Sequence, residues 1–206
     1  MYNTLFQSVG LAAGVALVPG SRPTVLVPVP DRAPVPASTT GADRVIRAYL
    51  RLHGPATVAE AAGYLGTTQA EAKRMWPAGL APVTVGARTA YLPEEDLPAL
   101  RAAPAPDLVR LLPAYDPLLQ LRDRELLVPG AKERKALWRI LGNPGAVLAG
   151  GEVAGVWRTA KSTKARLALT VTPFGTLTAA VRTAVQAEAE MLAGLRGAAT
   201  ATVEYE

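Results

Sequence analysis

The chain has 206 residues and a formal net charge of +5, and it contains no cysteine and one histidine, His53. The lack of cysteine excludes disulfides, thiolate zinc sites and cysteine nucleophiles. A single histidine excludes a multi-histidine metal cluster and disfavours a Ser-His-Asp triad. Apolar runs stay below the ~18 residues that a membrane-spanning helix needs, and the apolar start lacks the basic residues of a signal peptide. We therefore expect a cytoplasmic protein with no membrane partner, no metal and no cofactor.

Residues 1–30 begin with a short helical pattern and continue into two apolar stretches. Val15–Val18 and Thr24–Val27 flank a Gly-Ser-Arg-Pro turn, so we expect these two segments to pair as strands. This order suits the end of a winged-helix unit whose beginning would lie upstream. Four prolines in Pro28–Thr40 then predict an extended linker.

Residues 41–92 carry the pattern of a winged helix-turn-helix. A helical period begins at Asp43 and ends at Gly54-Pro55, with one apolar face made of Val45, Ile46, Tyr49, Leu50 and His53. Two capping boxes follow, in which a threonine precedes a glutamate by three residues: Thr57 with Glu60, and Thr68 with Glu71. Two short strands, Pro82–Val85 and Arg88–Leu92, then flank Gly86-Ala87. Three helices followed by a hairpin indicate this motif.

Residues 107–206 indicate a small mixed domain, which follows a proline-rich linker or irregular helix at 93–107. The pattern predicts a β-barrel-like sheet and one long C-terminal helix. Its strands are expected at Leu108–Leu112, Ala146–Leu148, Val153–Arg158, Arg166–Val171 and Ala199–Tyr205, and its helix at Phe174–Leu195. The predicted fold class is therefore α+β, a winged helix-turn-helix followed by this domain.

Positive charge gathers between Leu119 and Arg166. This segment holds ten Lys and Arg residues against four Asp and Glu, so it carries +6 and all other residues together carry −1. Such a segment after a helix-turn-helix makes nucleic acid the expected partner. The candidate DNA-binding residues are Arg122, Arg124, Lys132, Lys135, Arg139, Arg158, Lys161 and Lys164, together with Lys73, Arg74 and Arg88 of the winged helix.

Each of these candidates has an alternative interpretation. The Arg122-Asp123-Arg124 triplet, expected on a strand or loop, has arginines that either bind phosphate or pair internally with Asp116 and Asp123. Lys132, Lys135 and Arg139 share one side of a helix or turn, which is either a DNA contact or a solvated face. Trp138 and Trp157 belong either to the core or to a base-stacking surface. Asp116 with Asp123 is the best candidate for a catalytic carboxylate pair, although the pattern supports it weakly.

Several motifs resemble those of one bacterial family. They are Leu111-Leu112-Pro113-Ala114-Tyr115-Asp116, Arg122-Asp123-Arg124 and Gly155-Val156-Trp157-Arg158, preceded by Tyr49-Leu50 and Gly54-Pro55-Ala56-Thr57. In order and spacing they are similar to those of tandem winged-helix DNA-binding proteins, a family that includes DNA glycosylases acting on interstrand crosslinks and alkylated bases. The resemblance runs from about residue 44 to 158, and more loosely to the C-terminus.

The resemblance implies three tandem winged helices and a C-terminal β-barrel-like domain. This chain looks like the end of the second winged helix (1–30), the whole third (41–92) and the C-terminal domain (107–206). The family's catalytic Gln-x-Gln or Gln-x-Asp pattern belongs to the first winged helix. Gln69-Ala70-Glu71 and Gln186-Ala187-Glu188 differ from it in residue type and in location. We therefore carry over no catalytic residue, and we expect glycosylase activity only if the natural protein is longer.

Three functions agree with these patterns. The first is a DNA-binding protein related to repair glycosylases, which grips intact or damaged double-stranded DNA through its basic C-terminal surface. The second is a winged-helix transcriptional regulator that reads one operator sequence. The third is a non-catalytic interaction module. Burial of Arg122, Arg124 and Arg158 in ion pairs would indicate it.

Overall fold

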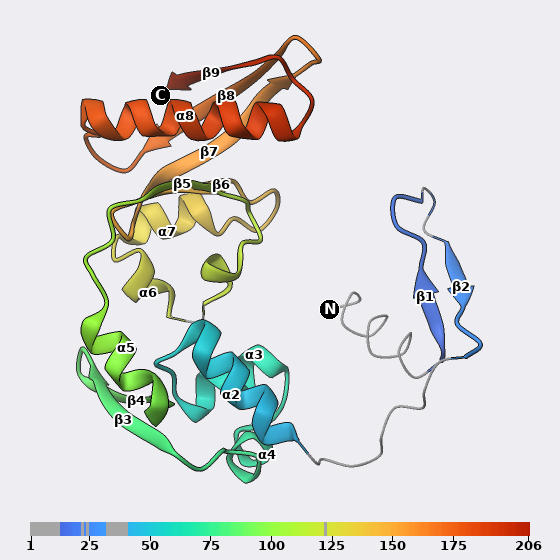
Figure 1. The fold of residues 1–206 in the computed structure, drawn as a ribbon, viewed down its shortest axis with the longest axis vertical. Coiled ribbons are helices and arrows are strands. Elements are labelled where there is room, and N and C mark those ends of the chain that lie inside the picture. The colour runs from blue at the N-terminus through green and yellow to red at the C-terminus, as the bar shows by residue number, and fades with distance from the viewer. Residues whose placement is uncertain (1–12, 22, 24, 32–40, 122) are drawn as a thin grey trace. The chain divides into compact units, whose positions relative to one another are not determined.

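The computed structural model describes residues 13–21, 23, 25–31, 41–121 and 123–206, and it divides into two compact units, Met1–Ala42 and Asp43–Glu206 (Figure 1). The helix predicted at the start of the chain, most of the linker that follows Pro28, and Arg122 lie outside the described residues. Each unit is considered by itself.

The first unit contains a two-stranded hairpin. Strand β1 (Val15–Leu17) pairs antiparallel with β2 (Leu26–Pro28), and Leu17 lies opposite Leu26. The backbone nitrogen of Val18 donates to the carbonyl of Val25 at 3.0 Å and continues the pairing toward the turn. The pairing predicted from the two apolar stretches is therefore confirmed.

The second unit opens with three helices and a hairpin, in the predicted order. The helices are α2 (Ala42–His53), α3 (Val58–Leu65) and α4 (Gln69–Arg74), and the antiparallel strands are β3 (Leu80–Val85) and β4 (Arg88–Pro93). Their core is built from the predicted face of α2, with Ile46, Tyr49 and Leu50 packed against Ala56 and Ala61. Val45, which we placed on that face, is exposed instead.

The first of the two predicted capping boxes is complete and the second is half formed. The Thr57 hydroxyl accepts from the backbone nitrogen of Glu60 at 3.3 Å, and the Glu60 carboxylate accepts from the backbone nitrogen of Thr57 at 2.7 Å. Thr68 also accepts from the backbone nitrogen of Glu71, at 3.1 Å. The Glu71 carboxylate, however, pairs with Arg74 one turn further along α4, so its charge is used within the helix.

A five-stranded sheet with helices on both faces makes up the C-terminal part. Its strand order is β5-β6-β7-β8-β9; only β8 and β9 run parallel, and α8 connects them (Figure 1). The elements are η1 (Glu94–Asp96), α5 (Leu97–Ala102), β5 (Val109–Leu112), η2 (Pro117–Gln120), α6 (Arg124–Leu127), α7 (Ala131–Leu137), β6 (Gly145–Ala149), β7 (Glu152–Ser162), β8 (Arg166–Pro173), α8 (Ala179–Leu195) and β9 (Thr200–Tyr205).

Alternating residues of the sheet enter two different cores, because successive side chains of a strand point to opposite faces. On one face, Val147 and Trp157 pack with Val185 of α8. On the other face, Ala146 and Val156 pack with residues of η2 and α7. Register shifts in β6–β7 and β7–β8 bend the strands. The sheet is not a closed barrel, since β5 and β9 do not pair with each other among the described residues.

Within the Arg122-Asp123-Arg124 triplet, which we expected on a strand or loop, Arg124 departs from the prediction, while Arg122 lies outside the described residues. Asp123 is the N-cap of the short helix α6, and its carboxylate accepts from the backbone nitrogen of Leu126 at 3.2 Å. An aspartate before a helix satisfies backbone donors that have no partner within the helix. Arg124 is therefore the first residue of a helix.

Among the described helices, none is long and apolar enough to cross a membrane.

Candidate nucleic-acid interface

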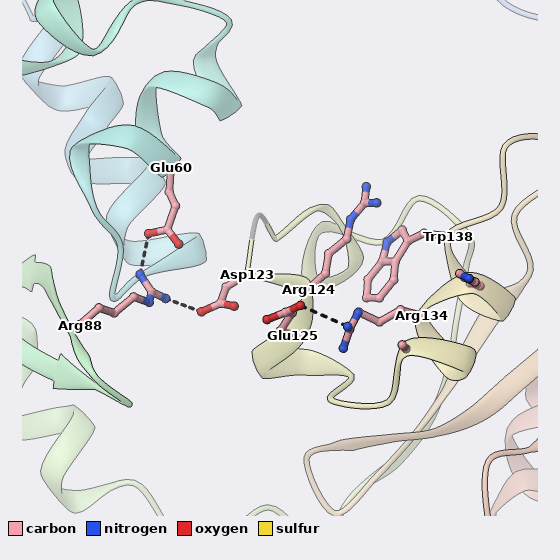
Figure 2. A pocket seen from close by; sticks show the side chains of 9 residues that line it. Glu60, Arg88, Asp123, Arg124, Glu125, Arg134 and Trp138 are labelled. Carbon is pink, nitrogen blue, oxygen red and sulfur yellow. Dashed lines mark hydrogen bonds and ion pairs between the residues drawn. The ribbon is translucent and has the colours of Figure 1, made fainter.

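The basic segment lines an open groove of about 670 Å³ (Figure 2). The wall is built by side chains from three separate parts of the sequence: α3, β4 and the segment that contains α6 and α7. It combines four cations with three carboxylates and one indole: Arg88, Arg124, Arg134, Lys135, Glu60, Asp123, Glu125 and Trp138. A groove with this composition can hold an anion only where its cations are not already paired.

Arg88, expected at the wing tip, forms two ion pairs. Its guanidinium contacts the Glu60 carboxylate at 2.8 Å and also pairs with Asp123 (Figure 2). Burial alone would lower the pKa of Arg88, but the hydrogen bond and charge of Asp123, together with Glu60, outweigh this effect and raise it. Arg88 thus joins the helical region to the cap of α6, and its predicted DNA contact stays a prediction.

Arg124 contacts an aromatic ring and, within the described residues, does not form the internal ion pair that was its alternative interpretation. Its guanidinium carbon lies 4.9 Å from the ring centroid of Trp138, in a cation–π arrangement. The Trp138 indole donates to the carbonyl of Leu119 at 3.0 Å, which fixes the orientation of the ring. Figure 2 shows both side chains next to each other among the residues that line the groove. Arg124 forms no ion pair among the described residues, so its charge is available to a ligand.

Arg134 is turned toward the protein. It donates to the carbonyl of Val128 at 2.9 Å and pairs with Glu125 at 3.1 Å. Its neighbours on α7, Lys132 and Lys135, are exposed and form no ion pair among the described residues. The exposure of these two lysines agrees with both predicted interpretations, a DNA contact or a solvated face. The helix ends at Leu137, however, so Arg139 lies beyond it rather than on the same helical face.

The remaining candidates of the basic segment are exposed and free of ion pairs within the described part of the chain. Arg158 on β7 donates to the carbonyl of Gly142 at 2.6 Å. Lys161 lies near the end of β7, and Lys164 follows in the turn before β8. The interaction-module hypothesis required Arg124 and Arg158 to be buried in ion pairs, and both are exposed. Arg122 lies outside the described residues.

The two candidates on α4 differ from each other. Lys73 is exposed and has no ion pair among the described residues, whereas Arg74 pairs with Glu71. An exposed pair three residues apart on a helix is weak and is screened by salt. It therefore leaves Arg74 able to exchange its partner for a phosphate.

The other polar candidates have structural roles in the described residues. Asp116 caps η2, where its carboxylate accepts from the backbone nitrogen of Leu118 at 2.9 Å. Asp123 is held by Arg88, so the two carboxylates do not act as a pair. Trp157 is buried in the core, and its indole donates to the carbonyl of Leu112 at 2.8 Å. No cluster of His, Cys, Asp and Glu suited to a metal occurs in the described part of the chain.

One protein family matches nearly the whole chain. The model of the family described as DNA glycosylase AlkZ-like matches residues 4–195. The chain belongs to the AlkZ-like DNA glycosylase family. This membership confirms the resemblance to a family that includes DNA glycosylases.

A solved structure agrees with the AlkZ-like assignment. The fold is similar to that of Streptomyces sahachiroi DNA glycosylase AlkZ, with a TM-score of 0.76 and 25% sequence identity, over 93% of this chain and 54% of that chain. This AlkZ-like chain therefore spans about half the length of that glycosylase. A comparison with curated proteins yields no match.

The sequence did not predict that three residues of this AlkZ-like chain, Glu60, Glu125 and Arg134, would line the groove. Glu60 was predicted only as part of a capping box, and Glu125 and Arg134 were only counted among the charges of the basic segment. A spacing of nine residues between Glu125 and Arg134 matches no single helix, so periodicity could not pair them. The contact of Glu60 with Arg88 spans 28 residues of sequence. The sequence showed only that four carboxylates lie within the basic segment, and not which cations they pair with.

Proposed function

We propose that this AlkZ-like chain grips duplex DNA through its basic C-terminal surface, as the DNA-holding part of a repair glycosylase. One observation carries the proposal. The exposed cations of the basic segment have no ion pair within the described residues, whereas Asp123 and Glu125 are each held by an arginine. The candidate DNA-binding residues among these cations, called the basic surface below, are Arg124, Lys132, Lys135, Arg139, Arg158, Lys161 and Lys164.

We also propose the finer domain assignment. Residues 41–92 form a winged helix-turn-helix, 107–206 a C-terminal β-rich domain, and 1–30 the end of a preceding winged-helix unit. The order of three helices and a hairpin supports this proposal, as do the similarity to AlkZ and the pairing of β1 with β2. In this arrangement Lys73 and Arg74 belong to the helix that faces a DNA groove.

We propose that the glycosylase reaction itself depends on the Gln-x-Gln or Gln-x-Asp pattern that the resemblance implies. The AlkZ-like family supports DNA as the substrate, and duplex DNA carrying a damaged base or a crosslink is the form that we propose. No Gln-x-Gln or Gln-x-Asp pattern occurs in the sequence. We therefore propose binding without base excision for this chain, and we name no catalytic residue.

The salt dependence of DNA binding tests this function. Each cation that neutralises a phosphate releases a condensed counterion, so the logarithm of the affinity falls linearly with the logarithm of salt concentration. With up to seven contacts we expect a slope of about −4 to −6 for duplex DNA. The measurement is fluorescence anisotropy of a labelled duplex titrated at several salt concentrations. Absence of binding at low salt, or a slope near zero, would contradict the proposal.

Competition with unlabelled DNA separates this function from a transcriptional regulator. A grip on phosphates depends little on sequence, because phosphates carry no sequence information. We therefore expect duplexes of unrelated sequence to compete about equally. A preference of about a thousandfold for one sequence, typical of specific readers, would favour the regulator instead.

A further inference from the structure

Two apolar side chains project from the turn between α7 and β6. Ile140 is 100% exposed and Leu141 is 85% exposed, which makes them the most exposed large apolar residues that the structure describes. Single exposed apolar residues are common on protein surfaces. Two adjacent ones at the tip of one turn, with almost no contact to the protein, indicate a contact with something else.

This turn is held by hydrogen bonds on both sides of the apolar pair. The backbone nitrogen of Arg139 donates to the Asn143 side chain at 2.8 Å, and Arg158 donates to the carbonyl of Gly142 at 2.6 Å. Gly142 has φ of +66°, the left-handed region that favours glycine. Polar contacts therefore define the shape of the turn, and Ile140 and Leu141 are presented outward without taking part in it.

Three cations of the basic surface are close to this tip in the sequence or bonded to it. Arg139 directly precedes Ile140, Lys135 lies in the last turn of α7, and Arg158 is hydrogen-bonded to the turn itself. All three are exposed and free of ion pairs in the described residues. The closest carboxylate in sequence is Glu133 on α7. An apolar tip with neighbouring cations is complementary to DNA, whose stacked bases are apolar and whose backbone is anionic.

We propose that Ile140 and Leu141 form a wedge that inserts between base pairs of duplex DNA, while Arg139, Arg158 and Lys135 hold the flanking phosphates. Apolar side chains such as Ile and Leu are used in this way by proteins that unstack and kink a duplex. The inference rests on the proposed DNA-binding function and adds a distortion of the bound duplex to it. Such unstacking would favour damaged sites, where less stacking is lost.

A duplex containing 2-aminopurine tests the wedge, since this base becomes more fluorescent when it is unstacked. The full chain is compared with the double variant Ile140→Ser/Leu141→Ser and with Leu195→Ser as a matched control. Leu195, on α8, is 80% exposed, so the control also removes one exposed leucine. A third variant, Ile140→Met/Leu141→Met, keeps the apolar character. Urea unfolding of each variant shows that the fold is retained.

We expect the wild type, the Met variant and the Leu195 control to increase the fluorescence. In the Ser variant the fluorescence increase should be smaller by about fivefold or more, because a wedge needs apolar side chains. Its salt slope should stay unchanged, because no cation is removed. If the wild type binds no duplex, the proposed function and the wedge both fail. Binding without a fluorescence increase, or with a full increase in the Ser variant, overturns the wedge alone.

Vesicles of phosphatidylserine distinguish the other anionic partner that an apolar, cationic tip could enter. The proposal expects vesicle binding to be the same in the wild type and the Ser variant. If the Ser variant loses vesicle binding and keeps its effect on 2-aminopurine, the tip is a membrane contact and the wedge is overturned.

Discussion

Arg88 joins three elements through one side chain. It extends from β4 and pairs with Glu60, which completes the capping box of α3, and with Asp123, which caps α6. Both carboxylates thus have two roles, holding a helix start and holding Arg88. An arginine suits this position because its planar fork donates in several directions at once.

Replacing this arginine is expected to destabilise the protein. Arg88→Met leaves two half-buried carboxylates near each other without a cation, so we expect the free energy of unfolding to fall by about 1–3 kcal/mol. Urea denaturation measures the change. The matched control is Arg74→Met, which breaks a pair on the exposed surface of α4 and should cost less than about 1 kcal/mol. Equal losses in the two variants would mean that the double pair of Arg88 does not stabilise the fold.

His53 gives the protein a predictable response to acid. The side chain is 4% exposed and forms a three-ring cluster with Tyr49 and Tyr64, and neither of its ring nitrogens has a hydrogen-bond partner among the described residues. Burial lowers the pKa of His53 below its ordinary value. The folded state therefore favours the neutral form of the His53 imidazole.

Stability should fall as the pH drops from about 6.5, the ordinary pKa of histidine, toward the lower pKa of the folded state. In this window the unfolded chain binds a proton at His53 that the folded chain does not, so the free energy of unfolding rises with pH. Above the window the contribution of neutral His53 to stability is fully present. Urea unfolding at pH 5, 6 and 7 measures the slope. His53→Phe keeps an aromatic ring and should flatten it; an unchanged slope in this variant would assign the effect to other groups.

At the scale of elements, the sheet is tied to α8 by carboxylates as well as by its apolar core. Glu188 accepts from the backbone nitrogen of Leu111 on the edge strand β5 at 3.2 Å. Glu190 accepts from the backbone nitrogen of Ala201 on β9, the opposite edge, at 3.0 Å. Unpaired donors at sheet edges invite pairing with other chains. One helix thus occupies donors at both edges of the sheet.

Gly145 on β6 is a position where the sheet admits no side chain. A Cβ atom there would collide with the indole of Trp157 and with the carbonyl of Leu112, the two groups that share a hydrogen bond of 2.8 Å. We expect Gly145→Ala to lower the free energy of unfolding by about 2–4 kcal/mol, since it combines overpacking with a strained buried hydrogen bond. Thermal or urea unfolding measures the loss.

Gly194 provides the opposite case within α8. Its Cβ would meet no atom within 4 Å, and alanine is the better helix former by about 1 kcal/mol in a helix interior. Gly194→Ala should therefore raise the free energy of unfolding slightly, by about 0.5 kcal/mol near the helix end. A loss of stability in this variant would show that the α8 backbone is not relaxed at Gly194.

At the scale of the whole molecule, charge is distributed unevenly along the chain. The segment from Leu119 to Arg166 carries +6, while all other residues together carry −1. Carboxylates outside this segment are partly engaged, as in the pairs of Arg47 and Arg51 with Glu95. The positive field is therefore concentrated on one stretch of sequence, and under the proposed function this field should raise the rate of association with DNA.

Removing two of these cations should change the salt dependence by a defined amount. Lys161→Ala/Lys164→Ala, in and beside the turn between β7 and β8, is expected to make the slope less steep by about 2, one counterion per lost phosphate contact. Arg101→Ala on α5 lies outside the basic segment and should leave the slope unchanged. Anisotropy titrations of a labelled duplex measure both. A slope identical to that of the wild type would exclude the β7–β8 turn from the DNA contact.

Local patterns predicted the local structure of this chain well. Thr57 with Glu60 forms the expected capping box, the two hairpins lie where turn residues separate apolar stretches, and α8 ends at Leu195 as predicted. These features depend on residues that are close in sequence, so a short window contains their cause. Within the triplet around Asp123, Arg124 was wrongly predicted on a strand or loop, because Asp123 caps a helix that begins at Arg124.

The amino-acid sequence by itself determined the elements, their order, the concentration of positive charge and the family resemblance. Only the tertiary structure decided which cations are free. Arg88 is paired because the fold brings Asp123, 35 residues away, into contact with it, whereas Arg124 is left with the ring of Trp138. Ion pairs depend on distances through space that no periodicity in the sequence encodes. The same reason applies to Ile140 and Leu141, since their exposure results from what the folded chain leaves uncovered.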